Sequence, residues 1–160
     1  MKIRTDFVTN SSSSSFIVVF ETKEEFDKKR QVAFENCPGA NYADRISEDI
    51  EYNKVTRQQV LDTIKENITH RVEWDLMWRH PKISKMEVQE LIKYQKTKEY
   101  KTLLSSMIEE RYNKVVERLP KRCYWYSIIG YSDSDGSFFS NLEHNIMPYM
   151  PFTFETISHH

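Results

Sequence analysis

The residues best suited to chemistry gather near the C-terminal end of the chain. Carboxylates and imidazoles occur together there, at Asp133, Asp135, Glu143, His144, His159 and His160. This combination supplies ligands for a divalent metal ion and groups for general acid–base catalysis. No lysine or arginine occurs from residue 123 to residue 160. If the three short segments that carry these side chains converge, we therefore expect an acidic pocket that binds a divalent metal.

Each part of this cluster also has a purely structural interpretation. Asp133-Ser134-Asp135-Gly136 is an ordinary tight-turn sequence. Glu143 and His144 are adjacent, so on a helix their side chains are expected to point in different directions. The two terminal histidines resemble the remnant of a purification tag. An EF-hand is excluded, because aligning Gly136 as the sixth loop residue places Leu142 where the twelfth-position glutamate belongs.

A run of five serines near the N-terminus is the second candidate site. Ser11, Ser12, Ser13, Ser14 and Ser15 lead directly into the apolar segment Phe16 to Phe20. Serine-rich segments are most often flexible tails. If Phe16 to Phe20 is a strand inside the sheet, however, the hydroxyls lie at its edge and are placed to bind an anion such as phosphate. No G-x-S-x-G motif accompanies them, which argues against a hydrolase nucleophile.

Two tryptophans form the third candidate. Trp74 and Trp78 follow His70 at helical spacing, with Met77 beside them. Such a stripe most often belongs to a core or an interface edge. If it is exposed, we expect Trp74, Met77 and Trp78 to form a surface that binds a partner protein.

The middle of the chain is basic. Residues 79–122 contain 12 Lys/Arg and 6 Asp/Glu. Most of the cations fall opposite apolar helical positions, which is typical of a solvated helix face, so nucleic acid is the less favoured partner.

Overall composition narrows the class of protein. The chain has 160 residues, a net charge of −1, three glycines and two widely separated cysteines. This excludes glycine-rich nucleotide loops and a disulfide scaffold. The longest apolar run near the N-terminus is five residues, too short for a signal peptide or a membrane span. We therefore expect a cytoplasmic protein that does not enter membranes.

The predicted elements indicate an α+β protein. Strands are expected at 16–20, 123–131 and 152–157, with a short helix from Ser137 to about 145. Helices are expected at 22–37, from 56 to Pro81, and at 97–119, and capping boxes are predicted at Thr22, Thr56 and Ser84. We predict a single domain, 1–160. A small antiparallel sheet comes from 1–21 and 121–160, and 22–120 forms a helical insertion.

Both ends of the chain resemble sequences found in uncharacterised bacterial and phage proteins. Phe7-Val8-Thr9-Asn10, the five serines and Phe16 match a start of the form F-V-[ST]-N-S-S-S-S-S-F. The tail resembles a closing pattern Y-S-D-x-D-G, L-E-H and I-S-H-H. The resemblance covers less than a third of the chain and carries no known activity. It implies that the ends form one unit and that the middle varies, and it argues against a tag origin for the final histidines.

Two functional hypotheses follow, and whether the chain is an enzyme stays open. The first is an interaction or regulatory protein, phage-associated as the resemblance implies, that binds a partner protein through its helical segment. The second is a metal-dependent hydrolase or phosphate-ligand-binding protein that uses the serines and the Asp/His cluster. An exposed tryptophan pair favours the first hypothesis, and convergence of the carboxylates, histidines and serines favours the second.

Overall fold

The computed structural model describes residues 13–37 and 41–158 of the chain. These residues form two compact units. The sheet unit consists of the described residues up to Thr56 together with those from Lys121 onward, and the helical unit is Arg57–Pro120. The sheet unit is thus assembled from both ends of the chain, and it includes the first helices as well as the strands.

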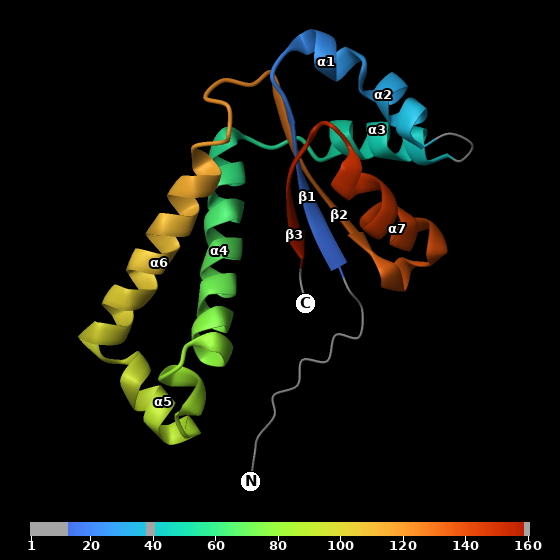
Figure 1. The fold of residues 1–160 in the computed structure, drawn as a ribbon. Coiled ribbons are helices and arrows are strands. Elements are labelled where there is room, and N and C mark those ends of the chain that lie inside the picture. The colour runs from blue at the N-terminus through green and yellow to red at the C-terminus, as the bar shows by residue number, and fades with distance from the viewer. Residues whose placement is uncertain (1–12, 38–40, 159–160) are drawn as a thin grey trace. The chain divides into compact units, whose positions relative to one another are not determined.

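A three-stranded antiparallel sheet organises the sheet unit, with strand order β2-β1-β3. Its strands are β1 (Ser13–Phe20), β2 (Trp125–Ser132) and β3 (Thr153–Ser158). Figure 1 shows the N-terminal strand β1 lying between the two C-terminal strands. The predicted α+β class, with a small sheet built from both ends and helices between them, is confirmed. Strand β1 begins earlier than expected and includes three of the five serines.

Short helices accompany the sheet in the same unit: α1 (Lys23–Asp27), α2 (Lys29–Asn36), α3 (Tyr42–Tyr52) and α7 (Ser137–Asn141). The capping box predicted at Thr22 is confirmed, since its hydroxyl accepts from the Glu25 amide while the Glu25 carboxylate accepts from the Thr22 amide. The single helix expected over 22–37 is interrupted at Lys28, and α3 was not predicted. Ser137 is the first residue of α7, and the cap position is Gly136.

The hydrophobic core of this unit covers one face of the sheet. Alternate side chains of β1 point to this face, where Phe16, Val18 and Phe20 are buried. Two residues of β2 join them, Ile129, which lies opposite Phe16, and Tyr131, which lies opposite Ser14. Helices α1, α2, α3 and α7 lie on this side of the sheet in Figure 1. Any polar group that faces this side therefore lies inside the core.

The helical unit is an antiparallel pair, α4 (Arg57–Arg79) and α6 (Lys98–Val116), joined by η1 (Ile83–Lys85) and α5 (Val88–Gln95). One stripe of α4 is buried, at Val60, Ile64, Ile68, Val72 and Leu76. The helix expected from Thr97 is confirmed, with the Thr97 hydroxyl accepting from the Tyr100 amide.

The capping box expected at Ser84 is wrong. Ser84 lies within the 3₁₀ turn η1, and α5 begins at Val88 after Glu87, whose side chain makes no capping bond. Within the described residues, no helix combines the length and the apolar character that a bilayer span requires.

Candidate functional site

The described serines lie where the first strand meets the ends of the other two. Ser13 is opposite Ser132, the last residue of β2. Ser14 is opposite Tyr131 on one side and Ser158, the last residue of β3, on the other. Ser13, Ser14 and Ser15 are therefore part of the central strand and lie next to the turn that carries Asp133. Ser11 and Ser12 lie outside the described residues.

Ser14 bonds to a carboxylate inside the core. Its hydroxyl donates to Glu143 Oε1 at 2.9 Å, and both residues are buried. Glu143 belongs to the π-helical turn η3 (Leu142–Ile146), which follows α7 and packs against β2. Among the described residues, the second carboxylate oxygen, Oε2, accepts no hydrogen bond. Glu143 is only 2% exposed, yet one of its carboxylate oxygens has a hydrogen-bond donor and the other has none among the described residues.

His144 approaches that unsatisfied oxygen from the solvent side. Its Nε2 lies 3.7 Å from Glu143 Oε2, and its side chain is 48% exposed. The tips of these adjacent side chains therefore converge, although residues at this spacing on a helix usually diverge. The structure brings together Ser14, Glu143 and His144, which we call the Glu143 cluster.

The aspartates of the predicted site lie in a turn. Asp133 and Asp135 are the ends of the 3₁₀ turn η2 (Asp133–Asp135), which the Ser132 hydroxyl caps by accepting from the Ser134 amide. Gly136 closes the turn with φ of +107°, a conformation that favours glycine. Across residues 13–37 and 41–158, no group of three or more His, Cys, Asp and Glu side chains is placed to hold a metal ion. His159 and His160 lie outside these ranges.

Sequence reasoning missed a second buried polar network. The Tyr131 hydroxyl donates to Asp49 Oδ2 at 2.8 Å, and Arg45 Nε donates to the same oxygen at 2.7 Å. Burial raises the pKa of the Tyr131 phenol far above its usual range, and the Asp49 carboxylate raises it further. Asp49 lies on α3, a helix that the sequence analysis did not predict. The helical spacing of the apolar residues Ala43, Ile46 and Ile50 could have indicated it.

The tryptophans expected to bind a partner are exposed. Trp74 is 50% and Trp78 66% exposed, and their ring centroids are 6.1 Å apart. Met77 beside them is half-buried. The Arg79 guanidinium lies 5.6 Å from the Trp74 ring centre, within cation–π range. We call Arg71, Trp74, Trp78 and Arg79 the tryptophan surface.

Several cations of the basic segment pair with carboxylates of the same unit. Lys114 bonds to Glu110 at 2.6 Å, Lys82 lies 3.5 Å from Glu99, and Arg111 bonds to Asp75 at 2.7 Å. Such exposed pairs are typical of a solvated helix surface.

No protein-family model, curated protein or solved structure matches this chain.

Replacing Ser14 with alanine should destabilise the sheet unit by about 1–3 kcal/mol, because both oxygens of a buried carboxylate then lack a donor. Ser13→Ala, at a half-buried neighbouring position, is the control and should change stability by about 0.5 kcal/mol or less. Urea unfolding is followed by Trp125 fluorescence in a Trp74→Phe/Trp78→Phe background, because the chain has three tryptophans. Equal stabilities of the two serine variants would contradict the bond's role.

Tyr131→Phe should lower the unfolding free energy by about 1–3 kcal/mol at neutral pH, because Asp49 loses a donor. A raised pKa in the folded state contributes stability that is complete below the unfolded pKa, about 10, and declines as pH rises above it. The difference between wild type and variant should therefore shrink above about pH 10. Tyr52→Phe, at an exposed tyrosine, is the control. A difference that stays constant up to pH 11 would contradict this linkage.

Proposed function

We propose that this chain is an interaction protein whose helical unit binds a partner protein through the tryptophan surface. The observation that supports this proposal is the exposure of Trp74 and Trp78, one turn apart on α4. A tryptophan buries roughly 150–250 Å² when it is covered, so two exposed neighbours offer a large apolar area for binding.

The two tryptophans are not needed for the core of the helical unit. A separate stripe of α4, from Val60 to Leu76, already supplies the buried side chains of this helix. In addition, tryptophan and arginine are the residues most enriched among those that dominate binding energy at protein interfaces. Their clustering on an exposed face therefore favours a binding role over a packing role.

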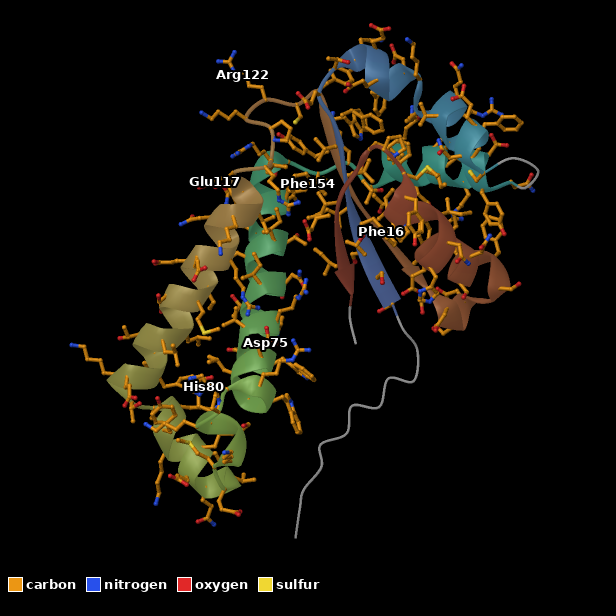
Figure 2. All side chains as sticks on the ribbon, in the orientation of Figure 1. Phe16, Asp75, His80, Glu117, Arg122 and Phe154 are labelled. Atoms are coloured by element: carbon orange, nitrogen blue, oxygen red, sulfur yellow. The ribbon has the colours of Figure 1, made fainter. Side chains whose placement is uncertain are left out.

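The charges around the tryptophans define the expected partner. Positions 67, 70, 71, 74 and 78 share one helical stripe and include no carboxylate. Asp75, labelled on α4 in Figure 2, pairs with both Arg111 and Arg79, so its charge is already compensated. Arg71 and Arg79 thus give the tryptophan surface one basic edge, and a complementary partner presents an apolar groove with carboxylates on the side that faces these arginines.

The test compares purified wild type, Trp74→Ala/Trp78→Ala and, as a matched control, Phe34→Ala/Tyr149→Ala, which removes exposed aromatic side chains from the sheet unit. A host protein retained by wild type and control, but not by the tryptophan variant, is purified and titrated by calorimetry. We expect the tryptophan variant to bind at least about 30-fold more weakly, since each central contact contributes about 2 kcal/mol. Arg71→Glu/Arg79→Glu should also weaken binding, because the partner is acidic.

Two results would contradict the proposal. One is equal affinity of wild type and tryptophan variant for every retained protein. The other is a wild-type dimer in sedimentation experiments that the tryptophan substitutions convert to a monomer, because the occupant of the surface is then a second copy of the chain.

A further inference from the structure

The unsatisfied oxygen of Glu143 needs a cationic or hydrogen-bonding partner. A carboxylate has two oxygens and about four lone-pair sites, and the described residues satisfy Glu143 only through the Ser14 hydroxyl. Burying an ionised carboxylate without a compensating group costs several kcal/mol. A buried polar atom without a partner commonly marks a bound ion or a functional group.

The distance between Glu143 and His144 suits a metal ion that lies between them. At 3.7 Å, Glu143 Oε2 and His144 Nε2 are too far apart for a direct hydrogen bond. Two ligands that bind one tetrahedral zinc ion at about 2.1 Å each are separated by about 3.4 Å. Because His144 is half exposed, a small rotation of its ring closes this difference.

Surrounding residues orient the Glu143 carboxylate for metal binding. The Ser14 hydroxyl occupies Oε1 and leaves Oε2 for the ion, as outer hydrogen bonds do at metal-binding carboxylates. Ser14 itself is fixed between two strands, through its pairing with Tyr131 and Ser158. The π-helical geometry of residues 142–146 is also a local feature that often occurs at functional sites.

From these contacts we infer that Glu143 and His144 are ligands of a divalent metal ion of the zinc type, with Ser14 as the residue that positions the carboxylate. An imidazole with a carboxylate favours zinc over calcium and magnesium, which prefer oxygen ligands alone. Two ligands from the described residues leave two positions of a tetrahedral zinc ion for water or other ligands, one more than in catalytic zinc sites, which have three protein ligands. This inference is independent of the tryptophan surface.

The experiment titrates untagged full-length protein with zinc chloride in competition with a chromogenic zinc indicator. We expect one zinc ion per chain, and at least about tenfold weaker binding in Glu143→Gln, His144→Ala and Ser14→Ala. His70→Ala, which removes an exposed histidine from the helical unit, is the matched control and should bind as wild type does. Zinc should raise the melting temperature of wild type but not of His144→Ala, and calcium and magnesium should raise neither.

Absence of stoichiometric zinc binding would overturn the inference. So would a His144→Ala variant that binds zinc as wild type does while His159→Ala/His160→Ala does not, because the ligands are then at the chain end. His144 is a surface residue, so its variant should fold, and Trp125 fluorescence, measured for each substitution in the Trp74→Phe/Trp78→Phe background, checks that the sheet unit is retained. Loss of zinc binding in these variants should leave partner binding by Trp74 and Trp78 unchanged.

Discussion

The structure of the sheet unit depends on the pairing of one N-terminal strand with two C-terminal strands. Strand β1 lies in the centre, so both edges of the sheet come from the other end of the chain. The Ser14–Glu143 bond joins residues 129 positions apart. Closing so long a loop costs conformational entropy before any contact is made. The buried face of β1, with Phe16 and Phe20, supplies the apolar contacts that offset this cost.

Polar pairs then fix how the neighbouring elements lie on that face. Helix α3 is attached to β2 through the Tyr131–Asp49 bond and through the Ile50 carbonyl, which accepts from the Ser127 hydroxyl at 2.6 Å and from Trp125 Nε1 at 3.2 Å. The turn η3 is attached to β1 through Glu143 and Ser14. Because a strand shifted by one residue turns every side chain to the other face, each pair can form in only one register. Apolar packing alone is less selective.

Local patterns predicted most elements, whereas the polar contacts of the core could not be predicted. The cap at Thr22 could be predicted because a capping box requires only residues three apart in the sequence. The capping box predicted at Ser84 does not form, because the chain makes a 3₁₀ turn there. The local sequence pattern does not distinguish such a turn from the start of a helix. Asp49, Ser14 and Glu143 each find partners from distant parts of the chain, and no single sequence encodes that proximity in its local spacing. Residue type alone placed Glu143 and His144 among the six candidate metal ligands, but their adjacency predicted diverging side chains rather than the observed approach of their tips.

Burial of the Glu143 carboxylate lowers the stability of the core. A leucine of similar volume at position 143 would avoid the desolvation of a carboxylate, and replacing buried charges with apolar groups is often neutral or stabilising. With one serine hydroxyl as its only donor among the described residues, Glu143 recovers little of that cost in the absence of a ligand. Departures from the rule that buried polar groups are satisfied occur mainly at functional sites. The proposed roles of Glu143 and of the exposed tryptophans therefore share one physical reason, because an unsatisfied buried oxygen and an exposed apolar pair both gain free energy when a ligand or partner covers them.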